Sequence, residues 1–117
     1  MQFAWFDSQL EECCISRSRL RAAVGGSAGA AEDLLHVVSQ APRLQDLATF
    51  KSVRIDVSGG SLTLSIEEID MHAKPLNSEG VPRDVHSRAT LPLYAQTQAL
   101  FIQDLRVRGQ SILRLAS

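Results

Sequence analysis

The strongest constraint on the fold of this 117-residue chain is a pair of alternating apolar segments that meet at residues 59–60, a Gly-Gly pair. Folding the chain about the two glycines gives a β-hairpin with one apolar face, because Val57 then lies opposite Leu62. The predicted register pairs Val53 with Ile66, Arg54 with Ser65, Ile55 with Leu64, Asp56 with Thr63 and Val57 with Leu62. A slip of one residue would expose every apolar side chain of this face, so the register is well specified.

Two glycines suit the turn because a type I′ hairpin needs positive φ at both central positions. An isolated hairpin is only marginally stable in water. Another part of the chain must therefore cover the apolar face.

The overall composition is that of one globular domain. The chain has 12 Lys and Arg residues against 13 Asp and Glu residues, which gives no basic field for nucleic acid or an anionic membrane. The two cysteines, Cys13 and Cys14, are adjacent and offer no disulfide framework. No stretch resembles a signal peptide or reaches membrane-spanning length. We therefore expect a cytoplasmic location, with the nucleus as a second possibility, and no nucleic-acid or membrane partner.

The N-terminal quarter carries mixed signals. Residues 8–11 have the form of a capping box, which predicts a helix over residues 8–24. A strand over residues 12–16 is the alternative. Residues 25–31 consist entirely of Gly, Ala and Ser and predict a flexible linker, because they lack the lysine and glycine spacing of a phosphate-binding loop.

The segments on either side of the hairpin favour strands. The apolar run at residues 34–39 could be helical, but its β-branched residues and the Ala-Pro pair at residues 41–42 favour a strand. Residues 70–84 contain two prolines and a glycine and predict a long loop. Further strands are predicted at residues 85–91, 99–102 and 112–115. A helix over residues 92–108 is an equal alternative on pattern alone, with Pro92 in its first turn and Gly109 after its end.

Residues that could carry chemistry are scattered. His36, His72 and His86 lack the spacing of metal ligands, so we expect no metal or cofactor site. The adjacent cysteines favour a packing role. The sequence therefore predicts no catalytic residue and no enzyme.

The one basic cluster near the end of the chain consists of Arg106, Arg108 and Arg114. If these arginines alternate along the last strands, they share one exposed face. The simple interpretation is a solvated face; the functional interpretation is a docking patch for an acidic partner segment.

The order of the segments resembles the CS-type and small-heat-shock (alpha-crystallin-like, HSP20-like) family. The similar parts are a strand ending in Ala-Pro at residues 35–42, the Gly-Gly hairpin at residues 53–64, the Leu-Pro pair at residues 91–92, the Ala-Leu-Phe at residues 99–101 and the final apolar run at residues 112–115. Within the family, the sequence at residues 55–59 and 91–94 is most similar to the C-terminal CS-type domain of PIH proteins.

This resemblance implies a mainly β fold, an antiparallel two-sheet β-sandwich, over residues 32–117. Residues 1–31 would then be an N-terminal extension of strand or helix followed by the flexible linker. It also implies a non-enzymatic co-chaperone or assembly adaptor that binds proteins through its sheet edges, with the heat-shock-protein-90 machinery and RuvB-like ATPase complexes as partners. The alternatives are a holdase of small-heat-shock type and a small α+β domain with helices at residues 8–24 and 92–108.

Overall fold

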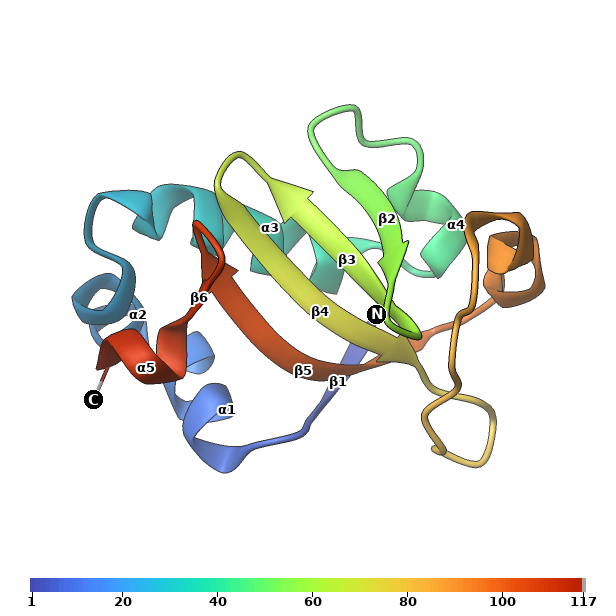
Figure 1. Cartoon of the computed structure of the whole chain (residues 1–117), viewed down its shortest axis with the longest axis horizontal. Helices are drawn as coiled ribbons and strands as arrows, with labels where there is room; N and C mark the ends of the chain where they lie inside the picture. The colour runs from blue at the N-terminus through green and yellow to red at the C-terminus, as the bar shows by residue number, and fades with distance from the viewer. Residues whose placement is uncertain (117) are drawn as a thin grey trace.

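The structure is a computed structural model that describes residues 1–116. A six-stranded sheet dominates the fold, and its helices are concentrated in the first half of the chain (Figure 1). In chain order the elements are β1 (Gln2–Trp5), α1 (Ser8–Ile15), α2 (Arg17–Val24), η1 (Gly25–Ser27), α3 (Ala28–Gln40), α4 (Leu44–Leu47), β2 (Arg54–Ser58), β3 (Ser61–Ile66), β4 (Ile69–Pro75), η2 (Arg88–Tyr94), β5 (Ala99–Val107), β6 (Gln110–Ser111) and α5 (Ile112–Ala116).

The sheet is built around an antiparallel meander. Its strands lie in the order β1-β5-β4-β3-β2, and β6 pairs with the end of β5. Strand β1 pairs in parallel with the side of β5 that faces away from β4, and Gln2 lies opposite Ala99. The two outermost strands of this order are therefore β1 and β2.

The central hairpin forms as predicted. Strands β2 and β3 pair with Val57 opposite Leu62 and Arg54 opposite Ser65, so the expected register is confirmed from residue 54 onward. Gly59 and Gly60 have φ values of 60° and 82°, as the turn requires. The apolar side of β3 is fully buried at Leu62 and Leu64.

The cover for this apolar face is helix α3, which corrects two predictions. Residues 25–31 are not a flexible linker, since they form η1 and the first turn of α3, and residues 34–39 are helix rather than strand. The helix contacts β3 and β4 and lies behind them in Figure 1. Its buried side chains recur at helical spacing: Ala28, Ala31, Leu34 and Val38. The small residues of the supposed linker are thus part of the packed stripe.

The helical structure predicted over residues 8–24 is confirmed, but as two helices, α1 and α2, that are separated at Ser16; the strand at residues 12–16 is wrong. The cap lies one residue earlier than expected, because the carboxylate of Asp7 accepts bonds from the backbone N–H groups of Gln9 and Leu10. Helix α1 buries Leu10 and Cys13.

Four other segments differ from the sequence-based expectation. Residues 70–75 belong to β4, so the long loop begins only at Leu76. Residues 85–87 are irregular chain and residues 88–91 belong to η2, whereas residues 112–115 belong to helix α5. No long helix spans residues 92–108, because β5 occupies Ala99–Val107. The last of these results confirms the strand predicted at residues 99–102.

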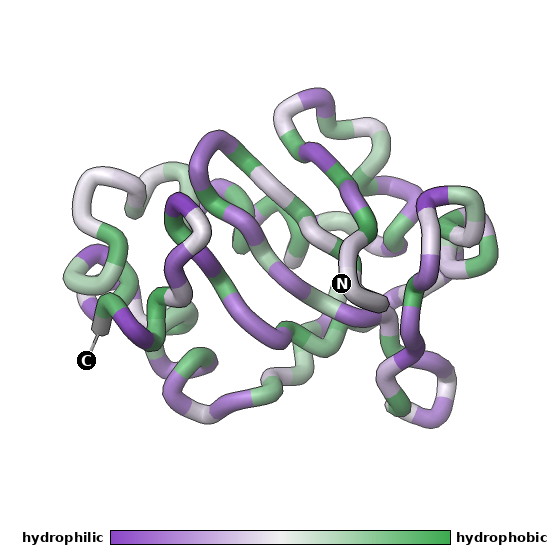
Figure 2. Tube along the Cα trace, in the orientation of Figure 1, coloured by the Kyte–Doolittle hydropathy of each residue, from purple (hydrophilic) through white to green (hydrophobic). Residues whose placement is uncertain are grey.

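One sheet and one helical layer make up the part of the chain that the structure describes. Side chains along the strands alternate between the helical side and an open side, as the mixed hydropathy of β3 to β5 in Figure 2 reflects. A second sheet, as a two-sheet sandwich requires, is not confirmed: residues 1–116 form a single sheet, and α3 covers its apolar face. The core is shared by N-terminal and C-terminal residues, from Leu10 to Ile112.

Among residues 1–116, no helix has both the length and the apolar character needed to cross a membrane.

Candidate protein-binding edge

Strand β2 presents an outer backbone edge that no strand within residues 1–116 occupies. In a two-residue hairpin the residues beside the turn exchange both ladder hydrogen bonds, and this alternates along the strand. Ser58, Asp56 and Arg54 therefore point their backbone groups toward β3. The backbone groups of Ile55 and Val57 point away from the sheet.

The hydrogen bonds around β2 agree with this geometry. The N–H of Val57 donates to the side-chain Oδ1 of its neighbour Asp56, at 3.2 Å, instead of to another strand. Among the described residues, no backbone hydrogen bond reaches the outward N–H of Ile55. The edge thus offers donors and acceptors at the spacing that an added strand requires.

The side chains of β2 give this edge two different faces. Ile55 and Val57 lie on the helical side and are only partly buried. Phe50, which precedes the strand, is 39% exposed. Arg54 and Asp56 lie on the open side of the sheet, and both are exposed. An extended segment next to β2 would contact apolar side chains on one face and one positive and one negative side chain on the other.

A later part of the chain passes close to this edge. The N–H of Val85 donates to the carbonyl of Gly60 at the hairpin turn, at 2.9 Å. Three residues later, the guanidinium of Arg88 lies 4.0 Å from the carboxylate of Asp56. Residues 86–89 are exposed and make no backbone hydrogen bond to β2 in the described structure. In the described structure this segment therefore meets β2 through a side-chain ion pair and not through backbone bonds.

The open side of the sheet is polar and internally hydrogen-bonded. The hydroxyl of Ser65 donates to Asp70, and that of Ser61 donates to Gln103. His72 lies in the centre, with its Nδ1 3.5 Å from the hydroxyl of Thr63. The carboxylate of Asp70 thus already has a hydroxyl donor, which is typical of a well-ordered surface.

The imidazole of His72 is shifted toward its neutral form. Partial burial lowers its pKa first, and the positive charge of Arg106 lowers the pKa further; Asp104 and Asp70 act in the opposite direction. Asp104 itself accepts hydrogen bonds from Arg106 and Ser111. Across residues 1–116, no group of three His, Cys, Asp or Glu side chains is placed to hold a metal ion.

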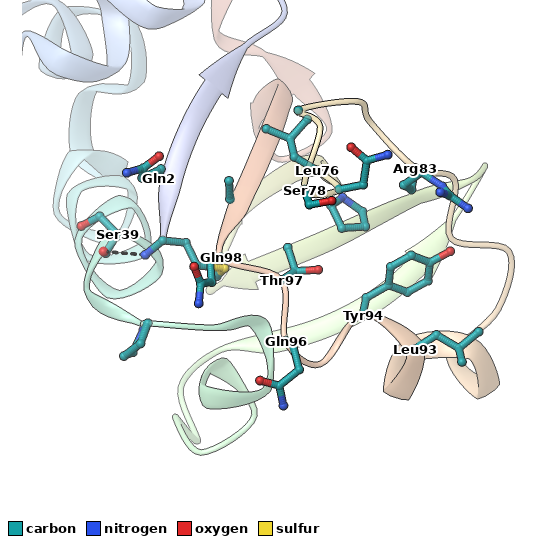
Figure 3. A pocket seen from close by; sticks show the side chains of 16 residues that line it. Gln2, Ser39, Leu76, Ser78, Arg83, Leu93, Tyr94, Gln96, Thr97 and Gln98 are labelled. Carbon is teal, nitrogen blue, oxygen red and sulfur yellow. Dashed lines mark hydrogen bonds between the residues drawn. The ribbon is translucent and has the colours of Figure 1, made fainter.

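A broad groove of about 1090 Å³ lies at the end of the sheet where β4 finishes and β5 begins (Figure 3). Its walls carry amide and hydroxyl groups from Gln2, Thr97 and Gln98, together with the ring of Tyr94 and the guanidinium of Arg83. The hydroxyl of Tyr94 donates to the carbonyl of Asp84, which fixes the ring. Groups of these types are suited to hydrogen bonds and stacking contacts.

The three arginines of the predicted docking patch lie on a strand, in a turn and on a helix, and not along one strand face. Arg106 lies on β5 and pairs with Asp104 at 2.9 Å. Arg108 lies in the β5–β6 turn with a φ of 50°, and Arg114 lies on α5. All three are exposed.

The other singled-out side chains have ordinary structural positions. His36 is exposed on α3, where its carbonyl accepts a bond from Ser39. Cys13 is buried and Cys14 is partly buried. Burial, followed by the neighbouring Cys13 and Asp104, raises the pKa of Cys14 to about 12, so this thiol is unreactive at neutral pH.

The sequence located the hairpin but did not show which of its strands lies at the edge of the sheet. That information depends on β4 and β5 joining the free side of β3, a pairing between segments far apart in the chain. Comparisons with protein families, with curated proteins and with solved structures found no match for this chain.

Proposed function

We propose that this protein is a non-enzymatic interaction module that binds an extended segment of a partner protein along β2. The observation that carries the proposal is the outward backbone of Ile55 and Val57 on an outermost strand, where no strand of the described residues pairs with it. An added strand would gain backbone hydrogen bonds there, which provide affinity independent of sequence. Alternate side chains of the partner would then supply selectivity.

The two faces of β2 predict how apolar and polar residues alternate in the sequence of the partner. Residues that meet Ile55 and Val57 would be apolar, and the residues between them would carry polar or charged groups facing Arg54 and Asp56. The ion pair between Arg88 and Asp56 is weak, since it joins side chains that are 71% and 70% exposed. A partner strand can therefore break this ion pair at small cost.

The class of partner follows from the sequence resemblance alone. CS-type domains imply co-chaperone or assembly-adaptor work with heat-shock-protein-90 or RuvB-like ATPase complexes, in the cytoplasm or nucleus. The two-sheet sandwich of that family would need a second sheet where α3 now packs. The proposal rests on the β2 edge and does not depend on that sandwich.

The test is a backbone substitution at the edge. Val57→Pro removes the outward N–H, and proline is tolerated on edge strands where that group faces solvent. Val57→Thr keeps the N–H and the β-branched shape and serves as the matched control. Purified heat-shock protein 90, a RuvB-like ATPase and proteins captured from cell extract would each be assayed for direct binding to the three forms.

The expected result is a partner that binds the wild type and Val57→Thr with similar affinity and binds Val57→Pro at least tenfold more weakly. A partner that binds the proline variant as tightly as the wild type would show that β2 is not its binding edge. If none of the purified or captured proteins binds directly, the interaction-module proposal itself fails.

A further inference from the structure

We propose that β2 also pairs with β2 of a second copy of this chain, antiparallel and about a two-fold axis through Ile55. The inference rests on the proposed function, because both need this edge to accept a strand. It goes further in naming the occupant of the edge when no partner is bound.

The sequence around Ile55 is self-complementary. Residues 52–58 read Ser-Val-Arg-Ile-Asp-Val-Ser, which is symmetric about Ile55 except that Arg54 is mirrored by Asp56. Antiparallel pairing about Ile55 therefore sets Arg54 of each copy opposite Asp56 of the other. Val53 lies opposite Val57, and the two Ile55 residues lie opposite each other. Opposite charges and β-branched pairs are both favourable across antiparallel strands.

Neighbouring registers lack this match. Only residues whose backbone N–H and C=O groups point outward can bond to a second edge strand, so the register can change only by steps that keep such residues opposite one another. An axis through Asp56 sets the two Asp56 carboxylates opposite each other, and an axis through Arg54 does the same for the two guanidinium groups. Like charges directly opposite are destabilising, so the axis through Ile55 is selected.

The backbone groups needed for this register are available. Each Ile55 would donate its N–H to the carbonyl of the other Ile55. Each Val57 N–H would leave the Asp56 carboxylate and donate to the carbonyl of Val53 in the second copy. The N–H of Val53 keeps its present bond to the carbonyl of Phe50, because the new ladder ends there.

Three contacts must give way. The guanidinium of Arg54 leaves the carbonyl of Glu67, to which it now donates at 2.8 Å. Asp56 exchanges Arg88 of its own chain, 4.0 Å away, for Arg54 of the second copy. The segment at residues 86–89 shifts away from the edge, and it loses no backbone bond to β2 by doing so. Self-pairing would then hide the edge, so that a partner strand has to compete with the second copy.

The test uses charge reversals that oppose each other across the axis. Arg54→Asp places two aspartates opposite each other at both ends of the pair, and Asp56→Arg places two arginines there. Each single variant is expected to be monomeric at concentrations where the wild type is a dimer by sedimentation velocity. Circular dichroism and a melting curve establish first that each variant is folded.

Two combinations restore complementarity. An equimolar mixture of Arg54→Asp and Asp56→Arg is expected to form a heterodimer, because at both ends of the pair an arginine of one variant then faces an aspartate of the other. The double variant R54D/D56R is expected to form a homodimer again. Arg88→Ala is expected to strengthen the wild-type dimer several-fold, because Asp56 loses its competing partner.

The inference is overturned if the wild type sediments as a monomer at all accessible concentrations, or if the charge reversals leave its dimer intact. It is also overturned if the mixture stays monomeric while the wild type dimerises. These outcomes are separate from failure of the proposed function. A monomeric wild type that loses a partner through Val57→Pro would keep the partner-binding edge and reject self-pairing.

Discussion

The hairpin turn allows a sharp test of the fold through Gly60→Val. Gly60 has a φ of 82°, a conformation that is strongly disfavoured for β-branched residues. Space is not the obstacle, because a Cβ at this position would meet Asp84 at 3.7 Å, an ordinary van der Waals distance. The expected loss therefore comes from backbone strain alone.

The magnitude follows from two opposing effects. A left-handed conformation costs an L-residue about 1–2 kcal/mol, and valine lies at or above the upper end of that range. Replacing glycine also reduces the freedom of the unfolded chain, which offsets about 0.4–1 kcal/mol. The net loss should be about 1 kcal/mol or more, a decrease of about 4 °C in the melting midpoint for a domain of this size.

The matched control is Gly29→Ala. Gly29 lies in helix α3, is exposed, and has nothing within 4 Å of an added Cβ. Alanine there should stabilise the protein by about 0.5–1 kcal/mol. Urea unfolding curves of the two variants should thus move in opposite directions from the wild type. Equal midpoints for Gly60→Val and wild type would refute the assignment of the turn, and destabilisation by Gly29→Ala would refute helix α3.

Three further results are expected. Leu64 is fully buried, so Leu64→Ala should lower the free energy of unfolding, measured in urea, by about 2–5 kcal/mol. Leu93 is 80% exposed, so Leu93→Ala should change it by less than about 0.5 kcal/mol. Similar losses for the two variants would contradict the placement of the core. Because the hydroxyl of Ser27 holds the pKa of Glu68 below its ordinary value, this carboxylate stabilises the fold above its unfolded pKa and loses that contribution as pH falls through its folded pKa. Ser27→Ala should raise that pKa in an NMR titration, and an unchanged titration would show that the bond is absent. The thiol of Cys14, with its pKa raised to about 12, should resist iodoacetamide at pH 8 until denaturant is added, so rapid alkylation of the folded protein would contradict its burial.

Sequence reasoning succeeded where the signal was local. The Gly-Gly turn and the alternation on either side of it determine the β2–β3 register through contacts between near neighbours, so the pairing of Val57 with Leu62 needed no tertiary information. The same holds for the helix that begins after Asp7.

The errors arose where tertiary packing overrides local preference. Residues 25–31 were interpreted as a linker because of their glycine and alanine content, and Val37 and Val38 favoured a strand. In the structure Ala28, Ala30 and Ala31 are buried on α3, and the packing of α3 against β3 and β4 stabilises a helix where local preference favoured a linker and a strand. Helical spacing from Ala28 to Val38 was present in the sequence but was divided between two predicted elements.

The candidate site was only partly predictable for a related reason. That β2 is an edge follows from β4 occupying the other side of β3, a pairing on which the hairpin itself carries no information. The arginines at positions 106 and 108 were expected on one strand face, but the chain turns at Gly109, where φ is 81°. The final apolar run became helix α5, since a short apolar segment fits either structure.

The parallel pairing of β1 with β5 has a consequence for the order of folding. Residues 2–5 find their strand partners at residues 99–102, so the first strand of the chain stays unpaired until the last long strand is present. Contacts of such wide sequence separation slow folding because the loop between them must be closed first. During synthesis, Phe3 and Trp5 would remain available to other chains or to chaperones until nearly the whole protein has emerged. The β2–β3 hairpin and α3, by contrast, can form earlier and provide the surface on which the sheet is completed.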